Sequence, residues 1–253
     1  MKKALLKEYL NEKADFYNQP RFIETDPIQI PHLFSKKEDI EIIGFLMATI
    51  AWGNRKSIIK NGHRLCDIMG NSPYDFVMEY DEKDATHLTF VHRTFNANDL
   101  HYFFIALKNI YTNYKGLEKV FALHTSETST QPAISAFKKL FFSLPHQTRT
   151  EKHISDPLKN SAAKRINMYL RWMVRKDNKG VDFGLWNSIA PATLSCPLDV
   201  HSGRVARDLK LLKRKQNDGK ALLELDTALR KLDPIDPTKY DFALFGLSAF
   251  ETF

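Results

Sequence analysis

The apolar residues of this chain recur at helical spacing, and this pattern constrains the fold more than any other feature. The segment EDIEIIGFLMATIAW (38–52) is almost continuously apolar and too long for a buried strand, so it predicts a buried helix. Further segments with a helical period lie at 98–114, 131–144, 161–176, 202–212 and 219–232. No hairpin dipeptide stands between alternating β-branched runs. We therefore expect an all-α fold of about eight to ten helices.

The spacing of the connectors bears on domain organisation. A chain of 253 residues can bury a sizeable core as one large domain or as two small lobes. Polar and proline-containing connectors lie at 19–35, 124–132, 145–160 and 177–198, and none is a flexible Gly/Ser linker. We expect a single helical domain over residues 1–253, built as two packed helical lobes.

Composition and charge narrow the class of protein. The hydrophobic share of 43% is that of an ordinary globular chain, which excludes intrinsic disorder. The net charge of +7 favours a polyanionic partner, because lysine and arginine release counterions from phosphates. Two cysteines, Cys66 and Cys196, cannot build a disulfide framework or ligate an iron–sulfur cluster.

The N-terminal segment and the lengths of the apolar runs bear on the cellular location of the protein. The opening MKKALLKEYLNEKADF lacks the apolar core of a signal peptide, and no run reaches the roughly 18 apolar residues that span a bilayer. We expect a cytoplasmic protein with no membrane partner. The nine histidines form no convincing ligand set, so we expect no metal, metal cluster or other cofactor.

Two short segments carry residues suited to chemistry. In SCPLDVHSGRV (195–205) an acid, a histidine and an arginine precede an apolar helix, either as a polar turn or as a reactive site. In SAAKRINMYLRWMVRK (161–176), Ser161 as N-cap places Lys164 third in the helix, and the core face comprises Ile166, Tyr169, Leu170 and Met173.

Lys164 has two interpretations. The helix dipole disfavours a cation in the first turn, which favours the neutral amine that covalent attack on carbon requires. The alternative makes Lys164 part of a solvated basic face with Arg165, Arg171, Arg175 and Lys176.

Together these segments resemble the helix-hairpin-helix DNA glycosylase superfamily. LDVHSGRVARDL (198–209) resembles the segment that follows the hairpin, in which an aspartate, a histidine and an arginine lead into a helix. NSAAKRINMYL resembles the second helix of the hairpin, with Lys164 at the place of the nucleophile. EIIGFLMATIAWGNRKSI (41–58) is similar to the helix and turn that enter the DNA stack when a base is flipped.

The closest resemblance within the superfamily is to the archaeal 8-oxoguanine DNA glycosylases. It rests on KRINMYLRWMVR, on the insert DNKGVDFGLWNSIAPATLSCPLD and on DPIDPTKYDFALFGL. The likeness covers about residues 40–247, with the hairpin and catalytic segment at about 153–210. DPLKNSAAK stands where the hairpin usually has a glycine-rich turn. Nearly the whole chain also resembles an uncharacterised bacterial family that shares WGNRK, AAKRINMYLRWMVRKD, PLDVH and DPTKYDFALFGL.

The resemblance implies an enzyme that excises a damaged or modified base from duplex DNA, either with or without abasic-site lyase activity. Lys164 would be the amine nucleophile, and the carboxylate of Asp199 would stabilise the sugar cation. Trp186, in the polar insert, is either a core residue or a base-pocket residue that would stack on the flipped base. The resemblance and the basic residues place the following at the DNA: Trp52, Asn54, Arg55, Lys159, Arg165, Arg171, His201 and Arg204.

Two other functions remain open. A nucleic-acid-binding protein could keep this fold without turnover, and a helical scaffold could bind another protein through its aromatic-rich lobe. The presence of both Lys164 and Asp199 favours the enzyme over the first alternative. The net charge favours nucleic acid over the second.

Overall fold

The helical periods of the sequence appear as helices in the structure, a computed structural model that describes residues 3–251. The only strands among these residues, Val91–His92 (β1) and Phe95–Asn96 (β2), pair as one antiparallel hairpin, so the all-α prediction is confirmed. The described residues form eleven α-helices: α1 (Lys3–Tyr17), α2 (Lys37–Ile50), α3 (Arg55–Ile68), α4 (Pro73–Glu79), α5 (Ala97–Tyr114), α6 (Leu117–Leu123), α7 (Gln131–Phe141), α8 (Lys164–Val174), α9 (Val200–Asp208), α10 (Gly219–Leu232) and α11 (Tyr240–Phe250).

The number of helices exceeds the expected eight to ten because short helices leave little trace in the sequence. The α4 and α6 helices have seven residues each, too few for an apolar period to repeat clearly. No helix in residues 3–251 is long and apolar enough to cross a bilayer.

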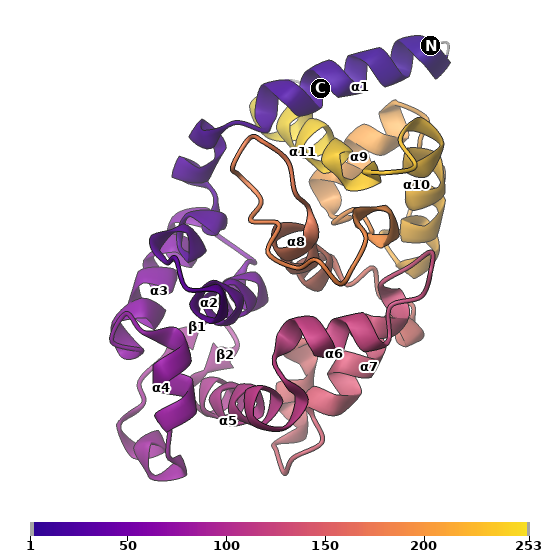
Figure 1. The fold of residues 1–253 in the computed structure, drawn as a ribbon. Coiled ribbons are helices and arrows are strands. Elements are labelled where there is room, and N and C mark those ends of the chain that lie inside the picture. Colours follow the sequence, from indigo (N-terminus) through magenta and orange to yellow (C-terminus); the bar gives the residue numbers. More distant parts are fainter. Residues whose placement is uncertain (1–2, 252–253) are drawn as a thin grey trace.

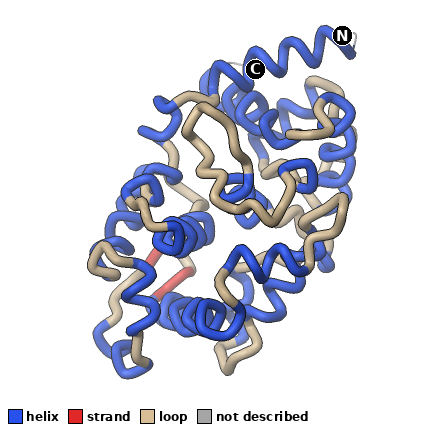
Figure 2. Tube along the Cα trace, in the orientation of Figure 1, coloured by secondary structure: helices blue, strands red, loops and turns tan. Residues whose placement is uncertain are grey.

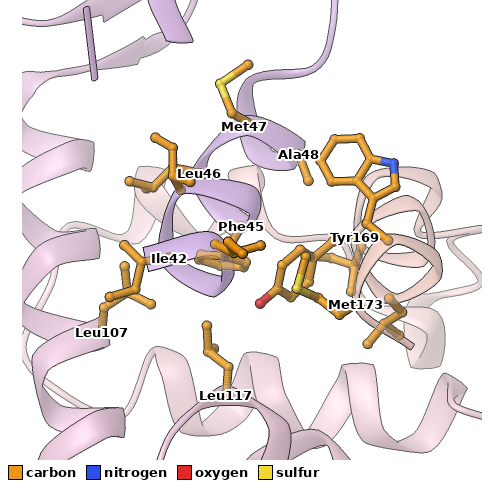
Figure 3. Close-up of a cluster of buried hydrophobic side chains, with 14 of the residues drawn as sticks. Ile42, Phe45, Leu46, Met47, Ala48, Leu107, Leu117, Tyr169 and Met173 are labelled. Carbon is orange, nitrogen blue, oxygen red and sulfur yellow. The ribbon is translucent and has the colours of Figure 1, made fainter. Parts of the chain in front are cut away.

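The buried apolar side chains form two clusters. The larger is built from α2 to α8 and includes Phe45, whose ring lies 5.7 Å from that of Tyr169 and 5.4 Å from that of Phe137 (Figure 3). The smaller is built from α1, α9, α10 and α11. Figure 1 shows this second group at one end of the molecule, where both termini lie. The expected core face of α8 is buried in the larger cluster.

The segment between α8 and α9 packs back on α8. The amide of Phe183 donates to the carbonyl of Trp172 at 2.8 Å, and that of Trp186 to Met173 at 2.9 Å. Figure 2 shows this long loop crossing in front of α8. The contact places residues 181–186 against the last turn of α8.

Trp186 is part of this packing, and its predicted role in a base pocket is wrong. The side chain is 2% exposed, and its Nε1 donates to Oε1 of Glu41 at 2.6 Å. Its ring lies between those of Phe121 and Tyr169 in the larger cluster. An indole held on all sides by the core offers no face to a ligand.

Two arginines of α8 are buried among carboxylates. Arg171 and Arg175 are each 4% exposed, and Asp182 accepts a hydrogen bond of 3.2 Å from both. Arg171 also pairs with Asp241 of α11, and Arg175 pairs with Asp236 at 2.9 Å. The interpretation of these arginines as a solvated face is therefore wrong, and Arg171 is not placed at the surface to contact a DNA phosphate.

We expect Asp182→Ala to lower the free energy of unfolding by about 3–5 kcal/mol, because it leaves two buried guanidinium groups short of a partner. The measurement is equilibrium unfolding in urea. Asp15→Ala serves as the control. Asp15 is exposed and its ion pair with Lys179 is long, at 3.8 Å, so this substitution should change the free energy of unfolding by less than about 0.5 kcal/mol. Equal losses of unfolding free energy in Asp182→Ala and Asp15→Ala would contradict the proposed stabilising role of Asp182 beside the two buried arginines.

Candidate active site

An irregular turn presents Lys164 at the head of α8. The helix begins at Lys164 itself, so the expected cap at Ser161 is wrong, although Lys164 does lie in the first turn. Ser161 instead accepts a hydrogen bond of 3.1 Å from the amide of Ala163 through its hydroxyl. Asn160 and Ala163 have φ of 59° and 44°, the left-handed region that glycine usually occupies. The turn therefore adopts left-handed backbone at two residues although neither of them is a glycine.

Asp199 is fixed by the start of α9. It is the N-cap residue: its Oδ1 accepts from the amide of Ser202 at 2.9 Å, while the Ser202 hydroxyl accepts from the amide of Asp199 at 3.0 Å. This reciprocal capping box satisfies backbone donors at the helix start and holds the carboxylate in one orientation. The second oxygen, Oδ2, is directed at the lysine.

The two side chains meet. Nζ of Lys164 lies 3.2 Å from Oδ2 of Asp199, and the side chains are 33% and 19% exposed. Burial opposes ionisation of Asp199, but the Lys164 ammonium and the Ser202 amide outweigh it and lower the pKa of this carboxyl below its usual value. Asp199 is therefore a carboxylate at neutral pH, in contact with an amine that solvent or a ligand can reach.

This pair lies in the wall of a cavity of about 570 Å³, where the two hydrophobic clusters meet. The volume is in the range of small-molecule sites. The wall is formed by the turns around Asp26, by Trp52 and Arg55 between α2 and α3, by Met168 of α8 and by Phe245 of α11. It combines apolar surfaces with convergent charged groups, as ligand sites do.

Two further carboxyl groups face this cavity, and no sequence pattern places them there. Asp26 stands between two short 3-10 turns, where its Oδ1 accepts from the amide of Ile28 at 3.0 Å, and burial raises its pKa. Burial likewise raises the pKa of Asp241 to about 6, although Arg171 opposes this. Asp26 stands in an Asp-Pro turn and Asp241 in the first turn of α11, and both look structural in the sequence.

Three of the expected DNA contacts lie between α2 and α3. Trp52 and Arg55 line the cavity, and the guanidinium of Arg55 lies 5.4 Å from the ring of Phe245. Asn54 is exposed and caps α3 by accepting from the amide of Ser57 at 3.2 Å. All three stay predictions as DNA contacts.

The other expected DNA contacts differ in whether their side chains are free at the surface. Lys159 is exposed in the turn before α8, and His201 and Arg204 are exposed on α9, each 3.1 Å from the hydroxyl of Ser248. Arg165 differs, because its guanidinium donates to the backbone carbonyls of Thr49 and His153. Arg165 therefore ties α8 to the end of α2 and has little freedom to bind a phosphate.

One cation beside the cavity was missed. Arg93 occupies the hairpin turn with φ of 56°, and its guanidinium lies 4.5 Å from the ring of Trp52. The hairpin is anchored by His92, whose Nε2 lies 3.1 Å from the carbonyl of Trp52 and whose Nδ1 lies 2.8 Å from Nδ2 of Asn61. No ion pair of Arg93 is found among the described side chains. VHRTF has no glycine or asparagine to mark it as a hairpin.

The double role of Asp199 can be separated by substitution. We expect Asp199→Ala to lower the free energy of unfolding by about 1–2 kcal/mol through loss of the cap, and Asp199→Asn, which keeps an acceptor, to cost less than about 1 kcal/mol. Chemical denaturation measures both. Asp208→Ala, at the exposed carboxyl end of the same helix, is the control and should be neutral or slightly stabilising. Equal losses for the two Asp199 variants would show that the cap contributes nothing.

Comparison with known proteins adds the family. No curated protein and no solved structure matches the chain. The family model described as "Protein of unknown function (DUF2400)" matches residues 26–250, a range that contains Lys164, Asp199 and every residue of the cavity wall except Phe22. Because this match spans most of the sequence, the chain belongs to the DUF2400 family.

Proposed function

We propose that this protein is a DNA glycosylase that excises a damaged or modified base, with Lys164 as the amine nucleophile and Asp199 as the carboxylate. The observation that supports this most is the 3.2 Å contact between Nζ of Lys164 and Oδ2 of Asp199 in the cavity wall. The two residues are 35 positions apart in the sequence, yet they meet where a small ligand would fit.

The chemistry follows from these groups. A base rotated out of the duplex enters the cavity, and its sugar lies against Lys164 and Asp199. As the N-glycosidic bond breaks, the Asp199 carboxylate stabilises the positive charge that develops on the sugar. Lys164 first gives a proton to Asp199 or to water and then bonds to C1′. The electron pair of the broken bond leaves with the base, which takes up a proton.

The same amine accounts for strand cleavage. Opening of the sugar ring and loss of the proton on the nitrogen give an imine between Lys164 and C1′. Removal of a proton from C2′ then expels the 3′ phosphate, and hydrolysis of the imine frees the lysine. A carboxylate next to the amine can carry these protons, and Asp199 is the group that the structure puts there.

The surroundings of the cavity fit a nucleic-acid substrate. Trp52, Arg55 and His201 line it, Lys159 and Arg204 are exposed, and the chain has a net charge of +7. A binding protein without turnover would use the same surface, so the deciding experiment must detect the covalent step.

That experiment is borohydride trapping on duplexes that contain an abasic site or 8-oxoguanine. We expect a covalent protein–DNA adduct with the wild-type chain and none with Lys164→Ala. Lys139→Ala, which removes an exposed lysine that does not line the cavity, is the control and should keep the adduct. Asp199→Asn should slow base release by at least about 100-fold.

Three results would count against the proposal. An adduct that persists in Lys164→Ala moves the nucleophile to another residue. No adduct and no strand cleavage with either duplex excludes the lysine mechanism. Tight duplex binding without any adduct leaves the binding protein as the function.

Arg93 gives a separate test of DNA contact. We expect Arg93→Gln to weaken binding to an abasic-site duplex and to lower the slope of log Kd against log salt concentration by about one, because one phosphate contact is lost. Fluorescence anisotropy over a salt series measures both quantities. Arg21→Gln is the matched control, since Arg21 is also exposed and lies 4.5 Å from the ring of Phe16. An equal effect of both substitutions would mean that only net charge matters.

A further inference from the structure

A second groove lies in the smaller cluster, between the start of α1, the loop after α9 and one face of α10. Its volume is about 590 Å³. Aliphatic side chains form its floor: Leu6, Leu209, Leu211, Ala228 and Leu232. Leu223 stands at its edge and is 66% exposed. An aliphatic floor beside an exposed leucine suits an apolar side chain from another molecule.

The rim of this groove is strongly basic. Five lysines line it, all exposed: Lys3, Lys210, Lys213, Lys220 and Lys231. None of them forms an ion pair with another side chain that the structure describes. The only carboxylate in the groove, Glu224, is already engaged, because it accepts from the amides of Lys213 and Arg214 at 2.7 and 3.3 Å. The groove therefore presents uncompensated positive charge around an apolar centre.

The geometry of α10 sets the length of what would fit. Lys220, Leu223, Thr227 and Lys231 follow one another at spacings of 3, 4 and 4 and so share one face of the helix. The eleven residue steps from Lys220 to Lys231 rise by about 16 Å. An extended peptide covers this distance with about five residues.

We propose that this groove binds an acidic peptide segment of another protein, with carboxylates on the lysine rim and an apolar side chain on the aliphatic floor. Charge complementarity supports an acidic partner, since the exposed ammonium groups lack carboxylates of their own. Individual exposed ion pairs are weak, so the apolar contact is needed for affinity, and the lysines mainly speed and orient association. This site is separate from the Lys164 cavity and does not depend on its chemistry.

The lining argues against a nucleic acid as the ligand. Single-stranded nucleic acid binds by stacking its bases on aromatic rings, and none of the described residues that line this groove is aromatic. A duplex backbone offers phosphates and sugars but no aliphatic group for the leucine floor. An acidic peptide with an apolar side chain offers carboxylates to the lysine rim and an aliphatic group to the floor.

The test uses the full chain and the fluorescein-labelled peptide Asp-Asp-Leu-Asp-Asp-Leu, followed by fluorescence anisotropy. We expect saturable binding that weakens at least about tenfold in Lys213→Glu/Lys231→Glu and in Leu223→Asp. Lys139→Glu/Lys152→Glu is the matched control, because it changes the net charge equally at exposed lysines outside the groove. A peptide with serine in place of both leucines should bind at least about tenfold more weakly.

Several results would overturn the proposal. The peptide fails to bind the wild-type chain, the control pair weakens binding as much as the groove pair, or the serine peptide binds as well as the leucine peptide. Displacement of the peptide by duplex DNA, with affinity for that DNA lost in Lys213→Glu/Lys231→Glu but kept in the control pair, assigns the groove to nucleic acid instead.

Discussion

The burial of Arg171 and Arg175 is the constraint on which the rest of the structure depends. A buried guanidinium is tolerated only with carboxylates around it, and here these come from Asp182 of the loop, Asp241 of α11 and Asp236 before α11. The requirement draws three parts of the chain onto one helix. Asp199 follows the loop, and Lys164 begins the helix, so the network that neutralises the arginines also fixes where these two side chains can meet.

Asp199 both caps a helix and contacts Lys164, the residue with which we propose that it acts. One carboxylate oxygen caps α9 and the other faces Lys164, so the geometry of the pair is set by a local capping motif. A carboxylate on a flexible side chain would lose entropy on meeting the lysine, whereas this one is already held. Residues 195–205 do form a polar turn before a helix. The capping hydrogen bond of this turn orients the Asp199 carboxylate toward Lys164.

The sequence predicts the long elements and misses what depends on tertiary partners. The helix expected at 219–232 has these bounds, and the core face of α8 is buried as its period indicates. The burial of Arg171 and of Trp186 could not be predicted. Periodicity shows which residues share a face, but it does not show whether carboxylates or aromatic rings will cover that face. Arg93 was missed for a local reason: an arginine in a left-handed turn gives no hairpin signal. The Lys164–Asp199 pair was expected only through the family resemblance, since no spacing rule joins residues so far apart.

The turn that presents Lys164 is held from outside as well as from within. Left-handed backbone at a non-glycine residue is unfavourable and persists only where its surroundings fix it. Here the amide of Gly219 donates to the carbonyl of Asn160 at 2.9 Å, and Nδ2 of Asn160 donates to Asp218 at 3.2 Å. Asp218 caps α10 and is itself held by Arg214 at 2.5 Å. The start of α10 therefore supports the start of α8. Strain of this kind concentrates at functional sites, and at Ala163 it immediately precedes the residue that we propose as the nucleophile.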